Sequence, residues 1–456
     1  MLESKSRIVL IVLSVVVLIV ALCTAFVFVT MHKDTNLFNK GFVATSKTGQ
    51  IVINPQFDGA DAFSEGLAAV RIGDDKTGKW GFIDGTEKFV INPQFDFAFS
   101  FAEGLARVRV GDDKTGKWGY IDKAGKYVIN PQFDSADVFI GDMAAVRIGD
   151  DKTGKWGYID KAGKYVINPQ FDSADRFAED AEILDVNPLR AIDEEGNLIE
   201  DWTKLACSQQ CLALVGIGDS ATRKYGYIDK AGKYAINPQF DAASDKFTGG
   251  LVAVRTGDPA TGKWGFIDKT GKYLINPQFD VADDFMYDVA GVRVGDDKTG
   301  KWGYIDKAGK YVVNPQFDAI FVFIGGLATV RIGDDKTGKW GFIDKTGKYV
   351  INPQFDGAQP FFGGFAAIRV GDDKTGKWGY IDKAGKYVIN PQFDAVEPFF
   401  GEFAAIRVGD DKTGKWGYID KAGKYVINPQ FDEAHAFAAN GLARVRVGQK
   451  WGYIAR

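Results

Sequence analysis

Histidine is nearly absent from this sequence, and its scarcity limits the chemistry that the chain can perform. The 456 residues include two histidines, His32 and His435. Histidine is the side chain most often used for proton transfer near neutral pH. No nucleophile, base and orienting group stand together outside the repeated positions described below. The sequence therefore predicts a protein that is not an enzyme, with no catalytic residues, no metal site and no cofactor.

An excess of positive charge is also lacking. Lysine and arginine together number 56 and aspartate and glutamate 60, which gives a formal net charge of -4 at pH 7. Domains that bind nucleic acid usually carry a basic patch and a high isoelectric point. We therefore expect no nucleic-acid partner.

Cysteine is scarce, with Cys23, Cys207 and Cys211 as the three copies. If the region around Cys207 and Cys211 lies outside the cytoplasm, these two can form a local disulfide. An inert pair of free thiols is the alternative. A zinc site is less favoured, because two thiols without a nearby histidine supply only half of a zinc shell.

Long apolar runs are scarce as well, and the single one stands near the N-terminus. Residues 8–29 carry no charge, and a helix of this length crosses a bilayer core of about 30 Å. Lys5 and Arg7 precede it, so the positive-inside rule keeps residues 1–7 in the cytoplasm. A cleaved signal peptide is the alternative, although its apolar region is usually shorter. We expect a transmembrane helix serving as a signal anchor, a tether at 30–40, and the remaining chain on the periplasmic or cell-surface side.

What the sequence does contain is one phrase that returns along its length. Its clearest copy, KWGYIDKAGKYVINPQFD, runs from Lys117 to Asp134. Most copies are 38 residues apart, a period typical of solenoids, propellers and other repeat arrays. The Trp-Gly pair recurs at Trp80, Trp118, Trp156, Trp264, Trp302, Trp340, Trp378, Trp416 and Trp451. The Asn-Pro-Gln-Phe-Asp segment begins at Asn54, Asn92, Asn130, Asn168, Asn237, Asn276, Asn314, Asn352, Asn390 and Asn428.

Each unit predicts three strands joined by tight turns. Residues 67–72 and 79–84 alternate in the period of two that a strand requires, and residues 126–130 are rich in β-forming side chains. We expect Pro131 to end the third strand, because proline cannot donate to a β-ladder. The loop at 73–78 has the glycines and aspartates of a hairpin turn. In the last unit this loop shrinks to Gly448-Gln449, which predicts a two-residue hairpin.

These repeats resemble the WG-repeat family, also called KWG repeats, whose units carry Trp-Gly-Tyr-Ile-Asp, then Pro-Gln-Phe, then Phe-x-x-Gly-Leu-Ala. The resemblance covers residues 41–456 apart from one insertion. It implies a β-rich interaction or structural module without a defined enzymatic activity. It supplies no catalytic residues.

One insertion interrupts the rhythm. Trp156 and Tyr225, which occupy equivalent positions in consecutive units, are separated by 69 rather than 38 residues (225 − 156 = 69). We assign the extra residues to 179–210, between a first block of repeats at 41–178 and a second at 211–456. Insertions in repeat arrays map to loops on one face, so a surface excursion is expected.

The architecture predicted from this pattern is all-β, with about ten three-stranded meanders stacked in an open, twisted solenoid. Propellers usually have about four to eight blades of four strands, which favours the solenoid. The array begins and ends in the middle of a unit, however, so its two ends could complete one blade. A closed β-propeller is therefore the alternative.

Stacked units place equivalent residues in columns. We expect the tryptophans named above to fill the core between units, with the following glycine allowing a neighbouring backbone to approach. An aromatic ladder for carbohydrate is the alternative. An arginine recurs in the first strand and needs a partner, either Asp84 and its equivalents or the tryptophan face. These arginines are Arg71, Arg109, Arg147, Arg255, Arg293, Arg331, Arg369, Arg407 and Arg446.

The segments after each Phe-Asp vary most, and we expect specificity to lie there. Exposed apolar residues mark interfaces, so the candidate contact residues are the phenylalanines of these segments, with inter-unit core as the alternative. They are Phe321, Phe323, Phe361, Phe362, Phe399 and Phe400. The sequence thus predicts a membrane-anchored, extracytoplasmic module that binds a protein partner or scaffolds the envelope. The alternative is a carbohydrate or cell-wall binder.

Overall fold

The computed structural model describes residues 49–177, 184–187, 190–192, 198–199, 211–438 and 440–456. The repeats belong to one compact unit that spans Ser46–Arg456. This described part of the chain consists of strands and turns without a helix, so none of its elements is a helix able to cross a membrane. The predicted transmembrane helix at 8–29 and the tether at 30–40 fall outside the described residues, and the prediction gains no support.

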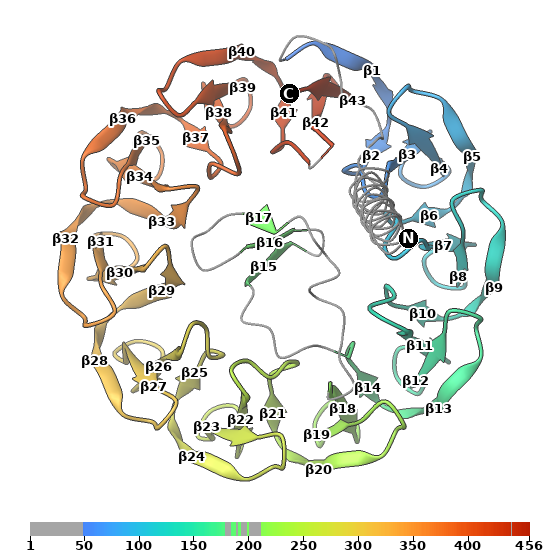
Figure 1. Ribbon diagram of the computed structural model, residues 1–456, viewed down its shortest axis with the longest axis horizontal. Helices are drawn as coiled ribbons and strands as arrows, with labels where there is room; N and C mark the ends of the chain where they lie inside the picture. Colours follow the sequence, from blue (N-terminus) through green and yellow to red (C-terminus); the bar gives the residue numbers. More distant parts are fainter. Residues whose placement is uncertain (1–48, 178–183, 188–189, 193–197, 200–210, 439) are drawn as a thin grey trace, which may run out of the picture. The chain divides into compact units, whose positions relative to one another are not determined.

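The described repeats form ten four-stranded antiparallel sheets arranged in a closed ring, which is a β-propeller (Figure 1). Each sheet is one blade. In every blade one strand lies on the inner side of the ring, and three further strands follow toward the outside (Figure 1). The inner strand is short in all blades except blades 7 and 8.

Every blade repeats this order of strands from the inside of the ring outward. Blade 1 has β2 (Gly59–Ala60), β3 (Leu67–Ile72), β4 (Lys79–Asp84) and β5 (Phe89–Phe95); blade 2 has β6 (Phe97–Ala98), β7 (Ala106–Val110), β8 (Lys117–Ile121) and β9 (Tyr127–Phe133). Blade 3 has β10 (Ser135–Ala136), β11 (Met143–Ile148), β12 (Lys155–Asp160) and β13 (Tyr165–Phe171); blade 4 has β14 (Ser173–Ala174), β18 (Ala213–Ile217), β19 (Lys224–Ile228) and β20 (Tyr234–Phe240). Blade 5 has β21 (Ala242–Ala243), β22 (Leu251–Thr256), β23 (Lys263–Asp268) and β24 (Tyr273–Phe279).

The second half of the ring follows the same order. Blade 6 has β25 (Val281–Ala282), β26 (Val289–Val294), β27 (Lys301–Asp306) and β28 (Tyr311–Phe317); blade 7 has β29 (Ala319–Ile324), β30 (Leu327–Ile332), β31 (Lys339–Ile343) and β32 (Tyr349–Phe355). Blade 8 has β33 (Gly357–Phe362), β34 (Phe365–Val370), β35 (Lys377–Ile381) and β36 (Tyr387–Phe393); blade 9 has β37 (Ala395–Val396), β38 (Phe403–Val408), β39 (Lys415–Asp420) and β40 (Tyr425–Phe431). Blade 10 has β41 (Glu433–Ala434), β42 (Leu442–Val447), β43 (Lys450–Ala455) and β1 (Ile51–Phe57).

Strand β1 closes the ring, because it is the outermost strand of the blade that the C-terminal residues begin. It pairs antiparallel with β43, and Phe57 lies opposite Trp451. The predicted open solenoid is therefore wrong, and the closed alternative is correct. The pairing of β1 with β43 completes the unit that is broken at both ends of the array, and the ring has more blades than propellers usually have.

The predicted count of three strands per unit is also wrong, because the variable segment supplies a fourth. This inner strand has two residues in eight blades and six in β29 and β33. A two-residue strand is too short to display a period of two, so periodicity could not reveal it. The predicted strands at 67–72 and 79–84 are confirmed as β3 and β4.

The outer strand continues through the proline that was expected to end it. Strand β9 runs to Phe133 and includes Pro131, and its register against β8 shifts between Trp118 and Tyr120. This irregularity brings the outer backbone over Gly119, where an added Cβ would lie 2.5 Å from the Ile129 carbonyl oxygen. The predicted role of the glycine in Trp-Gly is confirmed. Proline on an edge strand also removes a donor that could pair with another chain.

The hydrophobic core lies between successive blades. One cluster joins Phe82 of blade 1 to Phe101 and Val108 of blade 2. The two rings are 4.9 Å apart, and Tyr120 and Phe139 form the next pair, at 4.8 Å. Each blade therefore buries its apolar face on its neighbour, as repeat proteins do.

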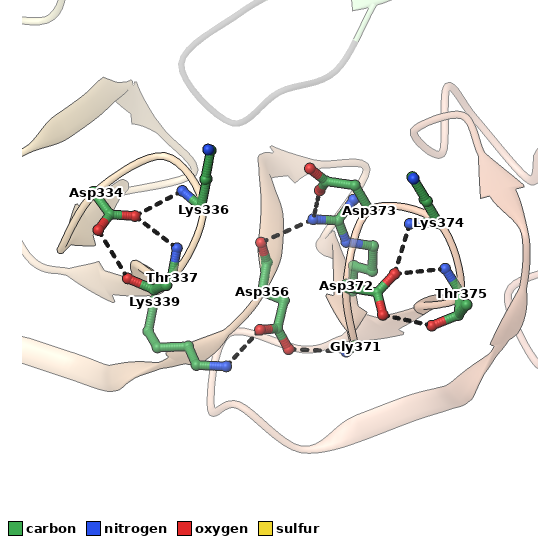
Figure 2. A network of polar contacts seen from close by, with 11 residues as sticks. Asp334, Lys336, Thr337, Lys339, Asp356, Gly371, Asp372, Asp373, Lys374 and Thr375 are labelled. Carbon is green, nitrogen blue, oxygen red and sulfur yellow. Dashed lines mark hydrogen bonds and ion pairs between the residues drawn. The ribbon is translucent and has the colours of Figure 1, made fainter.

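An ion pair accompanies each of these contacts. Lys79 of blade 1 donates to Asp96 at 2.6 Å, and the other oxygen of Asp96 accepts the Gly111 N–H of blade 2 at 2.8 Å. Figure 2 shows the equivalent contacts of Lys339, Asp356 and Gly371. Lys450 and Asp58 repeat the geometry at 2.6 Å where the ring closes. The closing contact thus has the same chemistry as the other nine.

The predicted insertion interrupts blade 4 between β14 and β18. It contains a small antiparallel sheet of β15 (Leu184–Asn187), β16 (Arg190–Ile192) and β17 (Leu198–Ile199). Strand β14 still pairs with β18, with Ser173 opposite Gly216. The blade therefore tolerates the insertion without losing its register.

Candidate functional site: the inner wall and the blade 9–10 hollow

Most of the phenylalanines predicted to contact a partner belong to the core. Phe361 is 0% exposed, Phe323 and Phe399 1% and Phe362 8%, and Phe400 packs against Phe362 with the ring centroids 5.4 Å apart. The first three occupy a position that holds a buried phenylalanine in all ten blades: Phe63, Phe101, Phe139, Phe177, Phe247, Phe285, Phe323, Phe361, Phe399 and Phe437. The prediction of an exposed apolar surface at these residues is corrected to inter-blade core.

Phe321 is the exception, since 43% of its surface is exposed. It stands three residues after the aspartate of its repeat, where the sequence changes from blade to blade. We call these ten residues the inner-wall positions, because each lies in or directly after an inner strand. They are Asp61, Phe99, Asp137, Asp175, Ser244, Asp283, Phe321, Gln359, Glu397 and His435.

At seven of the ten inner-wall positions the backbone carbonyl accepts a tyrosine hydroxyl of the preceding blade, while the side chains differ. Before Phe99, Asp283 and Gln359 the preceding blade carries a phenylalanine in place of this tyrosine. The Asp137 N–H donates to the Ala145 carbonyl, and the Asp137 carbonyl accepts the Tyr120 hydroxyl of the preceding blade at 2.6 Å. His435 is held in the same way, by Arg444 and by the Tyr418 hydroxyl at 2.7 Å. Burial raises the pKa of Tyr120, so this hydroxyl keeps its proton and donates.

Carboxylates occupy the inner-wall positions of blades 3, 4 and 6, and in blade 5 Asp245 stands next to the inner-wall residue Ser244. Although Asp175 and Asp283 reach solvent, the surrounding protein removes part of their hydration. This desolvation, together with the nearby Asp245 and Asp137, raises the pKa of Asp175 to about 6. Desolvation and the adjacent Asp284 raise the pKa of Asp283 to about 6. This part of the wall is acidic at neutral pH.

Aromatic rings occupy three of the other inner-wall positions. Phe99 stacks on Trp118 of its own blade with centroids 5.7 Å apart, and the Arg107 guanidinium lies 3.7 Å from the centre of the Phe99 ring. Phe321 lies 5.5 Å from Trp340, and His435 stacks on Trp451 at 5.7 Å. Three blades therefore place a ring from the inner wall against the repeated tryptophan.

The tryptophans were predicted to fill the core between units, but they are half-buried and lie against the edge of the inter-blade core. In all nine Trp-Gly units the recurrent arginine lies over the tryptophan ring, for example Arg331 at 5.4 Å from the centroid of Trp340. In seven units the second partner of the arginine is the loop aspartate four residues on, as Arg369 pairs with Asp373 (Figure 2). Blade 5 has Pro259 at this loop position. The second partner is not the equivalent of Asp84, which instead accepts the N–H groups of its own turn.

The loops that join the second and third strands of the blades are closed by their own aspartates. The Asp334 carboxylate accepts the N–H groups of Lys336 and Thr337 at 2.8 Å and the Thr337 hydroxyl at 3.0 Å (Figure 2). The same N–H and hydroxyl contacts lower the pKa of Asp334. These carboxylates therefore serve the turn.

Blade 10 departs from this pattern, because its loop has shrunk to Gly448 and Gln449. Gly448 has φ +61°, which confirms the predicted hairpin with glycine first. The lost loop removes the aspartate that pairs with the recurrent arginine. Glu433 supplies a carboxylate instead, and Arg446 lies 3.2 Å from it. In other blades the position of Glu433 holds a small or apolar residue, such as Gly59 or Ala395.

A hollow of about 460 Å³ lies between blades 9 and 10 at this shortened hairpin. Carboxylates on its lining outnumber cations. Its lining includes Glu397, Asp411, Asp432 and Glu433 against Arg407, Lys412 and Arg446, together with Trp416, His435 and Gly448. His435 lies 3.0 Å from Glu433 and 4.0 Å from Glu397. The hollow therefore joins inner-wall positions of two blades.

A disulfide between Cys207 and Cys211 was predicted, and of these two residues Cys211 lies in the described part of the chain. Cys211 is buried and disulfide-bonded, while Cys207 lies outside the described residues. Among the described residues, no three histidine, cysteine, aspartate or glutamate side chains are placed to hold a metal ion.

A family model described as WG containing repeat matches ten segments of the chain. They are 46–76, 80–114, 118–152, 156–181, 225–258, 264–298, 302–336, 340–374, 378–412 and 416–451. The chain belongs to the WG-containing repeat family. No curated protein matches the WG-repeat chain in sequence.

Two solved structures share a distant likeness with the WG-repeat chain. One, described as the crystal structure of the tricorn protease, has a TM-score of 0.24 and 12% identity, over 88% of this chain and 43% of that one. The other, from a structural and mechanistic study of two prolyl endopeptidases, has a TM-score of 0.31 and 11% identity, over 71% and 53%. The WG-repeat chain spans about half the length of these proteins, and likeness at this level carries no inference about activity.

Most of the phenylalanines that sequence reasoning chose as contact residues of the WG-repeat chain are core residues. Specificity was placed after each Phe-Asp, where the inner wall does lie. Within that segment the phenylalanines were chosen for being apolar, although a phenylalanine present in every unit is a core position. The useful signal was variation at one fixed place, which selects Phe321 and His435 and rejects Phe361.

Proposed function

We propose that this WG-repeat propeller is a non-catalytic protein-binding module whose contact surface is the inner wall. One observation carries the proposal: ten equivalent backbone positions stand in one ring and present different side chains. Many of the residues that repeat from blade to blade, such as the buried phenylalanines and the Lys-Asp ion pairs, are used in contacts between blades. The ten residues that differ lie in or directly after the inner strands and are all at least partly exposed. A surface of this kind can discriminate between partners.

The side chains of the inner wall suit a protein partner. The wall offers carboxylates on blades 3, 4 and 6, rings at Phe99 and Phe321, and the mixed charges of the hollow between blades 9 and 10. Protein interfaces combine aromatic anchors with charged and hydrogen-bonding groups. The chain has no excess of positive charge that would favour nucleic acid.

The proposal includes attachment to a membrane with the propeller outside the cytoplasm. The apolar run at 8–29 with Lys5 and Arg7 before it supports this placement. The disulfide bond of Cys211 supports it independently, since disulfides persist in oxidising compartments. Protease added to intact cells should digest the propeller, and a propeller that is protected until the cells are lysed would contradict the placement.

Cross-linking mass spectrometry on intact cells tests the protein-binding proposal. We expect Phe321→Ser to lower the yield of the principal cross-linked protein several-fold, because an exposed aromatic anchor is lost. Leu274→Ser is the matched control, since Leu274 is 50% exposed on the outer strand β24. Equal yields from the two variants, both folded, would refute the inner wall as the contact surface.

Carbohydrate binding through the tryptophan column is the weaker proposal. An arginine lies over each of the nine rings, and a sugar stacked on that face would have to displace it. Retention of the purified chain on peptidoglycan or polysaccharide, abolished by Trp302→Ala, would restore this proposal.

A further inference from the structure

We propose that the hollow between blades 9 and 10 binds the basic side chain, arginine or lysine, of a protein partner. That the occupant belongs to a protein rests on the proposed function; that it is cationic rests on the hollow itself.

The hollow exists where a repeated loop is missing. Blade 9 carries the full loop from Gly409 to Gly414, whereas blade 10 turns at Gly448 and Gln449. Gly448 lies on the wall of the hollow, and an added Cβ there would meet no atom within 4 Å. We infer that the four residues absent from blade 10 would otherwise occupy this volume. A space of about 460 Å³ is within the range of roughly 300 to 1,000 Å³ typical of ligand sites.

The charges on the lining favour a cation over an anion. Two of the lining cations already have carboxylate partners, because Arg407 pairs with Asp411 and Arg446 with Glu433. Asp432 is paired as well, with Lys415 at 2.6 Å. An anion entering the hollow would meet four carboxylates and three cations, Lys412 included, and two of these cations are already paired. The same pairs engage the carboxylates, but a carboxylate has about four lone-pair sites, so each can still accept from an added guanidinium or ammonium group.

The carboxylates remain within reach of an occupant. Side-chain exposure is 89% for Asp411, 38% for Glu433 and 29% for Glu397. They come from two blades and from both the loop and the inner wall. A basic side chain inserted between them would therefore contact both blades, and hydrogen bonds between charged groups are the stronger kind.

Calorimetry with a short probe tests the inference on the full chain. We expect acetyl-Gly-Arg-Gly-amide to bind and acetyl-Gly-Glu-Gly-amide not to bind. Asp411→Asn should weaken binding of the arginine probe about tenfold, the equivalent of losing one charged hydrogen bond. Asp373→Asn is the matched control, since Asp373 pairs with Arg369 in the same loop position but is not on the lining. It should leave binding unchanged.

A loop restoration provides a second, independent test. Replacing Gly448-Gln449 with the six-residue sequence Gly-Asp-Asp-Lys-Thr-Gly, which other blades already carry, should fill the hollow and abolish binding of the probe. No binding of the probe to the parent chain, equal loss in both aspartate variants, or undiminished binding after loop restoration would each overturn the inference. A chain that binds the probe but captures no protein in cells would refute the proposed function and leave the cation site standing.

Discussion

The glycine of each Trp-Gly pair shows how closely single residues determine this fold. At Gly119 the obstacle to a side chain is steric, because three backbone atoms of the outer strand, from Ile129 to Pro131, would lie 2.5 to 2.8 Å from a Cβ. Gly448 differs, since its φ of +61° favours glycine and the surrounding space is open.

Gly119→Ala should therefore lower the free energy of unfolding by about 3 kcal/mol, because the outer strand must move away from its partner. Gly448→Ala should cost only about 1 kcal/mol, the price of a left-handed conformation. Urea unfolding of the two variants measures both values. Equal losses would show that the outer strand does not press on Gly119.

Glu87 is the opposite case, a non-glycine residue at φ +71°. Its position in the turn of blade 1 is occupied by glycine in other blades, such as Gly125 at φ +80°. Glu87→Gly should raise the free energy of unfolding by about 1 kcal/mol through relief of this strain. Thermal unfolding of the variant provides the measurement. A lower melting temperature would mean that the contact of Glu87 with Gln56 outweighs the strain.

At the scale of the strand and the blade, the repeated sequence predicts the strands and turns that form from neighbouring residues. The second and third strands alternate clearly and end in glycine turns, so β3 and β4 were placed correctly. The inner strand has two residues and its pairing depends on the blade around it, so no local pattern marks it. The prediction that Pro131 ends the third strand was wrong. Proline breaks central strands, whereas β9 is an outer strand with an irregular register.

The ion pairs between blades set the response of this array to acid. The hydrogen bond from Lys224 has the largest effect on the pKa of Asp241 and lowers it; desolvation opposes this, and the Gly257 N–H adds to it, so that the pKa lies below its ordinary value of 3.8. A carboxylate with a lowered folded-state pKa contributes stability above the unfolded-state pKa, and this contribution disappears as the pH falls through the folded-state pKa.

Asp241→Asn should therefore lower the melting temperature at pH 7, and the difference from the parent chain should shrink toward zero near about pH 2. Asp142→Asn, at an exposed carboxylate in blade 3, is the control and should change neither value. Melting curves across this pH range test the assignment. A deficit of Asp241→Asn that stays constant with pH would contradict it.

At the scale of the whole molecule, closure links the first strand of the array to the last. Sequence reasoning could not establish it, because a broken unit at each end is compatible with a ring and with an open array. The contact that decides is the pairing of Phe57 with Trp451, between residues from opposite ends of the repeats. The inner wall also depends on closure, since Asp61 and His435 become neighbours only in a ring.

Phe57→Ala should be as destabilising as Phe133→Ala, by about 3 to 5 kcal/mol, because each phenylalanine is 1% exposed in its outer strand. Urea unfolding of the two variants makes the comparison. In an open array Phe57 would lie in an unfinished end unit. Phe57→Ala would then leave the free energy of unfolding nearly unchanged, while Phe133→Ala would still lower it.

Electron microscopy of the purified chain tests the closed ring most directly. Class averages viewed along the short axis should show one unbroken ring divided into ten blades. Class averages showing a rod, or an arc with a gap between blades 10 and 1, would contradict the ring and with it the continuous inner wall on which the proposed function depends.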